Sequence, residues 1–363
     1  MQTEIKEVNL YSTVSTLSKP IADATHDISK ISFYILEVVL KSGVKGQGYL
    51  LSFHYSPNAI EGALKDVRNF VLKGGYHAYE TVRVKLDWDK EAEYFGNNGV
   101  QNCAIAALNI AMWDAWGKTV GLPIWKMLGS NSRKIPVYGS GGWTSYSDEE
   151  LLEEVLDYQK RSFTAVKVKV GHPDGIERDV QRLRICREHL GSSTRIMMDA
   201  NQGLDVPTAL ALASTARNIG IRWFEEPINK DNYAGYQLLR NQCGIAIACG
   251  EREYDSMALK ELIKRNAIDM WQPDLVRMGG VESWKNSIAL ANAYDIPALP
   301  HYYKDYDVPL LCTIPTKVYG AESFDWIDAI IDNTMRIENG YAYPRETPGW
   351  GFSFKEEFLT PVK

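Results

Sequence analysis

From about residue 134 onward, short apolar segments alternate with amphipathic helical segments, and this alternation limits the folds open to the chain. Residues 147–161 and 177–190 are typical of the helical segments. Strands that are joined through helices by short links pair in parallel, which favours an α/β fold. Eight strand candidates can be identified, at 135–142, 165–171, 195–201, 221–227, 245–251, 268–274, 296–301 and 316–324. The pattern therefore predicts a (β/α)8-type barrel.

An open, doubly wound sheet is the alternative fold for the same alternation. Dinucleotide-binding sheets of that kind carry a GxGxxG turn after the first strand. The nearest match here, GSGGW at 139–143, lacks the required spacing. We therefore favour the barrel.

The residues on either side of the repeating pattern predict a second, smaller unit. Residues 4–50 are rich in β-forming residues and contain a glycine turn, and helical segments follow them. We expect residues 1–125 to form an α+β capping domain and residues 126–330 to form the barrel. The last segment, 331–363, is rich in aromatic and turn residues, and we expect it to pack back on the capping domain and complete it.

The composition argues against several classes of partner. The net charge is −6 and no basic cluster occurs, so a nucleic-acid partner is not expected. The apolar runs fall well short of the ~20 residues of a membrane helix, and the N-terminus does not resemble a secretory signal. Five scattered cysteines without CxxC spacing suggest reduced thiols. We expect a cytoplasmic protein, assembled as a homo-oligomer, that binds neither nucleic acid nor membrane and acts on a small molecule.

Ionisable residues stand at the ends of successive strand candidates, at separations of 21 to 30 residues, close to one strand–helix unit each. They are Lys169, Asp199, Glu225, Glu251, Asp274, His301 and Glu322. The carboxyl ends of barrel strands meet at one mouth, where the active sites of such barrels lie. The spacing therefore predicts that these side chains converge on a single site.

Three consecutive members of this series, Asp199, Glu225 and Glu251, are carboxylates from neighbouring strands. Converging carboxylates repel one another unless they are protonated or share a cation, and oxygen ligands suit Mg²⁺. Single acids of this kind often cap the following helix, but three in succession favour a metal site. Asn201 faces the same way as Asp199 and is a candidate for substrate binding, whereas Glu226 has the opposite parity and is interpreted as structural.

The other members of the series suggest acid/base chemistry. Asp274 and His301 end neighbouring strands, and an aspartate beside an imidazole fixes its tautomer and raises its basicity. Lys167 and Lys169 share one face of a strand whose other face is valine, so in a barrel both point inward. Each ammonium lowers the pKa of the other, as does a nearby Mg²⁺. Lys169 and His301 would then stand on opposite sides of the metal, an arrangement suited to removing a proton next to a carboxylate.

The motifs at these positions resemble those of the enolase superfamily, and specifically of its mandelate racemase subgroup. They are KVKVG at 167–171, MMDANQ at 197–202, WFEEP at 223–227, CGERE at 249–253, QPDLVRMGG at 272–280, PH at 300–301 and AES at 321–323. Residues 106–129 are similar to the helix that leads into the barrel in this family. The resemblance covers nearly the whole chain.

This resemblance implies a role for each strand-end residue. Asp199, Glu225 and Glu251 would be the Mg²⁺ ligands, and Lys169 would be one acid/base group. Lys167 would lie next to the substrate carboxylate. His301, oriented by Asp274, would be the other acid/base group, and Glu322 would bind the substrate carboxylate or the enediolate as a protonated acid.

Specificity would depend on two cap loops, around 19–27 and 50–58, which are polar and suit a hydroxylated acid. Their candidate residues are Asp23, His26, His54 and Tyr55, and Tyr302, Lys304 and Asp305 could bind the distal end of the substrate. Arg277 stands where mandelate racemase has a lysine and is more similar to the acid sugar dehydratases. The first loop also resembles that of the talarate/galactarate dehydratases.

We therefore expect a Mg²⁺-dependent acid sugar dehydratase that forms a 2-keto-3-deoxy acid sugar. A racemase or epimerase of a 2-hydroxy acid could use the same enediolate. A Schiff-base aldolase and a non-catalytic sugar-acid binding protein are further alternatives.

Overall fold

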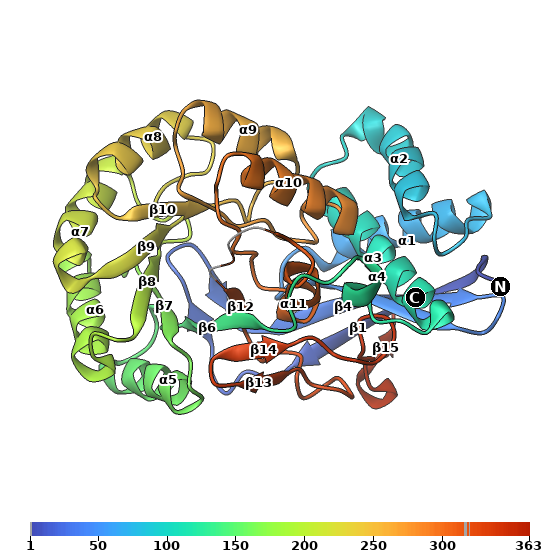
Figure 1. Ribbon diagram of the computed structural model, residues 1–363, viewed down its shortest axis with the longest axis horizontal. Coiled ribbons are helices and arrows are strands. Elements are labelled where there is room, and N and C mark those ends of the chain that lie inside the picture. The colour runs from blue at the N-terminus through green and yellow to red at the C-terminus, as the bar shows by residue number, and fades with distance from the viewer. Residues whose placement is uncertain (1, 316–317, 319) are drawn as a thin grey trace.

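A parallel barrel lies at the centre of the computed structural model, which describes residues 2–315, 318 and 320–363 (Figure 1). Its strands are β6 (Ile135–Gly141), β7 (Ala165–Lys169), β8 (Arg195–Asp199), β9 (Ile221–Glu225), β10 (Ala246–Cys249), β11 (Met270–Trp271) and β12 (Ala321–Ser323). Strands β6 to β11 pair in chain order, and β12 pairs with β6.

The ring of pairings closes between β11 and β12 through single parallel bridges. Ala298 bridges Trp271 on one side and Val318 on the other, at the position of the seventh predicted strand. The chain continues from Val318 into β12, which returns to β6. This closure confirms the predicted α/β fold class. Part of the predicted last strand, at residues 316, 317 and 319, lies outside the described residues.

Helices surround the barrel strands, and the first of them form an arc on the left of Figure 1. They are α5 (Asp148–Lys160), α6 (Ile176–Leu190), α7 (Val206–Ile219), α8 (Tyr233–Gln242), α9 (Ser256–Lys264) and α10 (Val281–Ala293), followed by α11 (Lys304–Leu311) after the seventh strand. Local sequence starts several of them: Ser147 and Glu150 form a capping box at α5, and Asp205 caps α7.

The two faces of each barrel strand have different neighbours. On β7, Val166 and Val168 belong to the large core, which includes the surrounding helices, while Lys167 and Lys169 have the opposite parity. A smaller core fills the barrel interior and consists of Tyr138, Ala165, Met197, Trp223, Ala248, Met270 and Leu299. Lys169, Asp199 and Glu225 share the parity of this interior core and lie above it. Glu251 has the opposite parity to Ala248 and follows the end of β10.

The N-terminal residues form an antiparallel sheet covered by helices. The sheet contains β1 (Ile5–Ser15), β4 (Ile31–Leu40) and β5 (Lys45–Leu51), and the helices are α1 (Pro57–Gly74), α2 (Thr81–Ala92), the short 3₁₀ turn Glu93–Phe95, α3 (Val100–Val120) and α4 (Ile124–Met127). Strand β5 packs directly on α3 through Gly46 and Gly48. The approach is so close that a Cβ at Gly46 would collide with the backbone oxygen of Ala111, and a Cβ at Gly48 with that of Ala107. This contact holds the sheet on the helix that leads into the barrel.

The C-terminal segment is shared between the two units. The hairpin of β13 (Arg336–Glu338) and β14 (Tyr341–Tyr343) extends the barrel sheet, since β14 pairs antiparallel with β6. The chain then crosses to the cap, where the indole N–H of Trp350 donates to the carbonyl oxygen of Ile110 at 2.9 Å. After the 3₁₀ turn Glu356–Phe358, β15 (Thr360–Pro361) pairs with β1, and both termini lie on the cap side in Figure 1. Among the described residues, no helix has the length and apolar character of a transmembrane span.

Candidate active site

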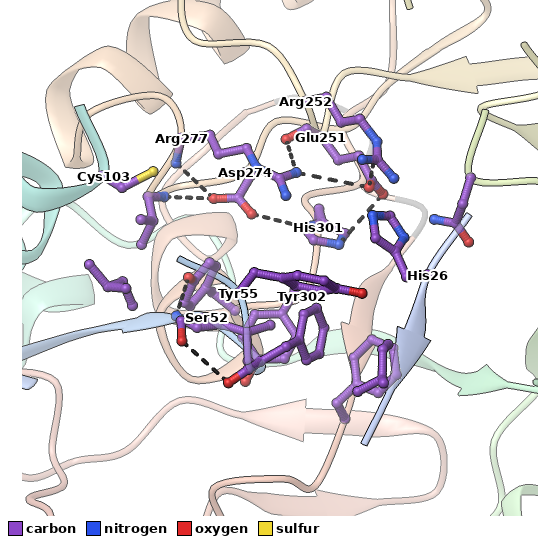
Figure 2. Close-up of a pocket in the computed structure, with 18 of the residues that line it drawn as sticks. His26, Ser52, Tyr55, Cys103, Glu251, Arg252, Asp274, Arg277, His301 and Tyr302 are labelled. Atoms are coloured by element: carbon purple, nitrogen blue, oxygen red, sulfur yellow. Dashed lines mark hydrogen bonds and ion pairs between the residues drawn. The ribbon is translucent and has the colours of Figure 1, made fainter. Parts of the chain in front are cut away.

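A cavity of about 380 Å³ lies where the cap meets the carboxyl ends of the barrel strands. Four segments supply its walls: the hairpin of β2 (Ile21–Ala22) and β3 (Asp27–Ile28), the loop after β5, the start of α3, and the loops that follow the barrel strands. Figure 2 shows Glu251, Arg252, Asp274, Arg277 and His301 gathered on one side, with Tyr55 and Tyr302 on another. The cavity therefore combines charged groups from the barrel with residues from the cap.

Three buried carboxylates from consecutive strand ends form a candidate metal centre. Oxygen atoms of Asp199, Glu225 and Glu251 lie within 4.8 Å of one another. Asp199 and Glu225 are completely buried, and Glu251 is 4% exposed and lines the cavity. Three hard oxygen donors this close together fit a divalent cation such as Mg²⁺, because only a cation offsets their mutual repulsion in a buried site. The predicted metal-binding residues are thus brought together.

Both lysines of β7 are ion-paired with these carboxylates. Lys167 Nζ contacts Glu225 and lies 2.7 Å from Glu322 Oε1 and 3.3 Å from Asp199 Oδ2. Lys169 Nζ lies 2.6 Å from Asp199 Oδ2 and also lines the cavity. Lys167 contacts the carboxylates but does not line the cavity. Its place next to the substrate carboxylate, which the resemblance implies, stays a prediction.

The pKa of both lysines differs in direction from the sequence-based expectation. Burial disfavours the ammonium form of Lys169, but the carboxylate of Asp199 outweighs it and raises the pKa. For Lys167, burial is likewise outweighed by Glu225 and Glu322, and the pKa rises well above its usual range. The expectation considered the neighbouring ammonium and a bound Mg²⁺, but omitted the nearer carboxylates, whose charges dominate both pKa values when no cation is bound to them.

His301 and Asp274 form the predicted pair. Nδ1 of His301 lies 2.8 Å from Asp274 Oδ2, and Nε2 lies 3.5 Å from Glu251 Oε2. Burial lowers the stability of the imidazolium, but the charge of Glu251 and the hydrogen bond to Asp274 outweigh it and raise the pKa of His301. His301 therefore lies between the metal centre and its orienting carboxylate and is suited to proton transfer.

Glu322 lies on the barrel wall next to Lys167, and its surroundings favour the ionised form. Its Oε2 accepts a hydrogen bond of 2.9 Å from the backbone N–H of Tyr302, and its Oε1 pairs with Lys167. Burial alone would raise the pKa of Glu322, but Lys167 and His301 outweigh it and lower it. The ionised form of Glu322 is favoured over the expected protonated acid, because the Lys167 ammonium lies 2.7 Å away. The sequence did not reveal this contact.

The backbone is strained directly after several strand-end residues. Asn201, Gln202, Glu226 and Tyr302 have positive φ angles of 42°, 66°, 35° and 65°. Non-glycine residues adopt this conformation at a cost, and such residues concentrate at functional sites. Glu226 does not line the cavity, and its Oε2 accepts a 2.9 Å hydrogen bond from Arg252.

The remaining predicted substrate-binding residues divide into two groups. Asp23, His26, Tyr55, Asn201 and Tyr302 line the cavity. The other three, His54, Lys304 and Asp305, do not.

The structure shows where these three residues lie instead. The ring of His54 packs on Tyr55. Helix α11 begins at Lys304, so Lys304 and Asp305 turn away from the cavity into a buried ionic network. Lys304 Nζ lies 3.1 Å from Asp325 Oδ1, and Asp305 Oδ1 lies 2.6 Å from Arg345. Their prediction as contacts to the distal end of the substrate is corrected accordingly.

Sequence reasoning missed an aromatic wall and one charged residue. Phe53, Trp143, Phe324 and Trp326 line the cavity, and the rings of Phe324 and Trp326 are stacked with centroids 4.3 Å apart. Phe324 directly follows the AES motif and Trp326 comes two residues later, so this motif could have identified them. Arg252, also missed, follows Glu251 and lines the cavity, as does Arg277.

Comparison with known proteins identifies relatives along nearly the whole chain. Residues 5–129 match the family model described as mandelate racemase / muconate lactonizing enzyme, N-terminal domain. Residues 150–358 match the model described as enolase C-terminal domain-like. The two matches follow one another in the order expected from the sequence motifs.

Several curated enzymes are similar to this chain. L-talarate/galactarate dehydratase of Salmonella typhimurium is 27% identical over 348 residues, which cover 94% of this chain and 86% of that protein. Arabinonate dehydratase of Saccharolobus solfataricus is 28% identical over 90% of this chain and 89% of its own length. D-galactarolactone cycloisomerase of Agrobacterium fabrum is 30% identical over 74% of this chain and 76% of its own length.

Solved structures agree with these similarities. L-talarate/galactarate dehydratase from Salmonella typhimurium LT2, liganded with Mg and L-lyxarohydroxamate, has a TM-score of 0.91 at 25% identity, covering 98% of this chain and 93% of the other. A racemase from Streptomyces coelicolor with bound magnesium has a TM-score of 0.93 at 25% identity, covering 98% of this chain and all of the other. Similar structures with bound magnesium support the metal centre at Asp199, Glu225 and Glu251.

Proposed function

Because the chain belongs to the mandelate racemase / muconate lactonizing enzyme family of the enolase superfamily, we propose that it is a Mg²⁺-dependent acid sugar dehydratase. The proposed reaction removes the proton next to a carboxylate and eliminates the 3-hydroxyl, which gives a 2-keto-3-deoxy acid sugar. The main support is that Lys169 and His301 both line the cavity that Glu251 of the carboxylate cluster also lines. The similarity to several acid sugar dehydratases adds to this support.

Each residue then has a proposed role. Asp199, Glu225 and Glu251 hold Mg²⁺, which when bound polarises the substrate carboxylate and stabilises the enediolate. Lys169, once its proton has been lost, takes the α-proton from one side of the substrate. His301, kept in orientation by Asp274, donates a proton to the departing 3-hydroxyl from the other. Asn201 and Tyr302 bind the substrate, and Asp23, His26 and Tyr55 contact it from the cap.

A racemase or epimerase is the second candidate, because it would use the same enediolate and the same two acid/base groups. The fold similarity to a racemase and the 30% identity to a cycloisomerase favour keeping it. A Schiff-base aldolase has less support, because its metal-free reaction gives no role to the buried cluster of Asp199, Glu225 and Glu251. A non-catalytic sugar-acid binder is not favoured by the nearly complete set of acid/base residues.

A substrate screen tests the proposal directly. A library of mono- and diacid sugars is incubated with the protein and Mg²⁺, and 2-keto acids are detected as semicarbazones. We expect product from at least one sugar acid, loss of activity with EDTA, and loss of activity in Lys169→Ala and His301→Asn. In D₂O, exchange of the α-hydrogen without formation of a keto acid would instead identify the racemase or epimerase.

Three outcomes would contradict the proposal. Full turnover in both variants would refute the assignment of the acid/base pair. Activity in EDTA together with trapping of substrate by borohydride would support the aldolase. Binding without turnover or exchange across the library would support the non-catalytic binder.

A further inference from the structure

A small hairpin of the cap covers one side of the cavity. We refer to residues 21–28, which include β2 and β3, as the lid. It carries Asp23 and His26, both of which line the cavity. Nδ1 of His26 lies 3.1 Å from each carboxylate oxygen of Asp23, so the pair forms a unit whose position depends on the lid. Figure 2 shows His26 extending from the lid strand toward the residues of the barrel.

The lid is attached to the barrel on two sides. On one side, the backbone N–H of Thr144, after β6, donates to the carbonyl oxygen of Ala22 at 2.8 Å, and the hydroxyl of Thr144 donates to the same oxygen at 2.9 Å. The backbone N–H of Ala22 donates to Ser145 Oγ at 3.1 Å. On the other side, the hydroxyl of Thr25 donates to the carbonyl oxygen of Asn201 at 3.1 Å. The tip of the lid therefore bridges the loops after β6 and β8.

Between these attachments, the methyl group of Ala24 rests on two glycines. A Cβ at Gly203 would lie within 3.0 Å of the Ala24 Cβ, and a Cβ at Gly171 would lie 2.7 Å from it. Cβ atoms do not approach one another this closely, since carbon atoms prefer separations of about 3.5–4.0 Å. Any side chain at either position would therefore displace the lid. Residue 171 is glycine also because its φ is +85°, a conformation that favours glycine. The φ angle of Gly203 is not positive, so its backbone conformation does not require glycine. The contact with Ala24 therefore gives a reason for the absence of a side chain at residue 203.

We propose that Gly203 and Ala24 are positioning residues, whose contact sets the height of the lid above the barrel and so places Asp23 and His26 in the cavity. The contact lies at the centre of the lid, between its two attachments, so a displacement there moves the tip that carries both residues. A shift of about 1 Å at an active site can lower catalytic efficiency by about 100-fold. The effect on activity rests on the proposed function, but the position of the lid does not.

A size exchange across the contact tests the proposal. Gly203→Ala adds a methyl group on the barrel side, and Ala24→Gly in the same chain removes the methyl group that it would strike. We expect kcat/KM to fall by about 10- to 100-fold in Gly203→Ala and to return to within about threefold in the double variant. Ala24→Val, which enlarges the contact from the lid side, is expected to have the same defect as Gly203→Ala. Gly62→Ala is the matched control, since a Cβ on this exposed turn of α1 would meet nothing within 4 Å.

Amide hydrogen exchange measures how firmly the lid is held on the barrel, and it needs no substrate. The N–H of Asp23 donates to the carbonyl oxygen of His26, and that of Ala22 to Ser145, so both are protected in the seated lid. We expect faster exchange at residues 21–28 in Gly203→Ala and normal exchange in the double variant, with Mg²⁺ affinity and thermal midpoint unchanged. This measurement remains valid if the protein proves not to be a dehydratase.

Two results would overturn the proposal. One is normal lid exchange in Gly203→Ala and Ala24→Val. The other is a defect in Gly203→Ala that the second substitution does not relieve, because this would place the conflict elsewhere, for example at the Ala200 carbonyl oxygen, which lies 3.1 Å from a Cβ at residue 203. If Gly203→Ala alone fails to fold, the rate of amide hydrogen exchange at residues 21–28 in Ala24→Val decides whether the contact positions the lid.

Discussion

Asp274 holds the imidazole of His301 with one carboxylate oxygen and is itself held by the other. Oδ2 lies 2.8 Å from Nδ1 of His301, while Oδ1 accepts hydrogen bonds from the backbone N–H groups of Val276 at 2.8 Å and Arg277 at 2.9 Å. The carboxylate therefore cannot rotate without losing these bonds. This arrangement fixes the orientation of the ring that faces Glu251.

Asp274→Asn is expected to lower kcat by about 100-fold with little change in KM, because an amide orients the ring less well and does not stabilise the imidazolium. The hydrogen bond to Asp274 contributes to the raised pKa of His301, so the matching limb of the pH–rate profile should move to lower pH. Steady-state kinetics across pH measures both effects. Asp231→Asn, on an exposed loop, is the control; equal kcat in Asp274→Asn and wild type would refute the role.

Glu225→Gln is expected to weaken Mg²⁺ binding by at least about 10-fold, since it removes one charge from the cluster. The amide oxygen can replace Glu225 Oε2, which accepts bonds from Trp223 at 3.2 Å and Gln272 at 2.7 Å. Lys167 loses its contact with Oε1 but keeps Glu322 at 2.7 Å as a partner, so the fold should tolerate the change. Isothermal titration with Mg²⁺ provides the measurement. Glu261→Gln on the surface of α9 should bind as wild type does, and undiminished binding in Glu225→Gln would exclude the residue as a ligand.

Lys304→Met is expected to lower the free energy of unfolding by about 2 kcal/mol, because it leaves Asp325 and Asp328 without their buried cation. Asp325 separates Phe324 from Trp326, so loosening this loop should also raise KM through the aromatic wall. Urea denaturation, with near-ultraviolet circular dichroism for the stacked rings, tests both effects. The exposed Lys264→Met provides the comparison, and an unchanged ring signal would argue against the link to the wall.

Glu154 predicts a pH dependence of stability. Burial raises its pKa from 4.5 to about 7, although Oε2 accepts a 2.5 Å hydrogen bond from the N–H of Gly142. In this range the folded protein binds more protons here than the unfolded chain. The free energy of unfolding should therefore fall as pH rises from 4.5 to about 7, by at most about 1.4 kcal/mol per pH unit, and level off above it.

Glu154→Gln should remove this contribution, so the variant gains stability relative to wild type as pH rises. Urea titrations from about pH 5 to pH 8 give the free energy at each pH. Glu153→Gln, one residue away and exposed, should keep the wild-type slope. Parallel curves for Glu154→Gln and wild type would show that the carboxyl is ionised throughout.

The barrel and its candidate metal centre could be predicted because they depend on the repetition of the strand–helix unit. Parallel strands bring their carboxyl ends to one mouth whatever the loops do, so Asp199, Glu225 and Glu251 had to meet. The alternation of β7 likewise determined that Lys167 and Lys169 face inward. None of these inferences needs a distance.

The tertiary structure decides how deep each strand residue lies in the barrel and in which direction the chain continues after each strand. Lys167 and Lys169 are equivalent in the strand pattern, yet only Lys169 lines the cavity. Lys167 contacts Glu225 and Glu322, which lie on β9 and β12, each one strand beyond the direct neighbours of β7. Lys304 follows His301 closely in sequence, but the start of α11 turns it toward Asp325.

Ala24 of the lid packs on Gly171 and Gly203, which are more than a hundred positions away along the chain. Strand order and the side that each strand residue faces follow from local periodicity. Which side chains touch across the cavity depends on the packing of cap on barrel, a long-range contact that no local pattern contains.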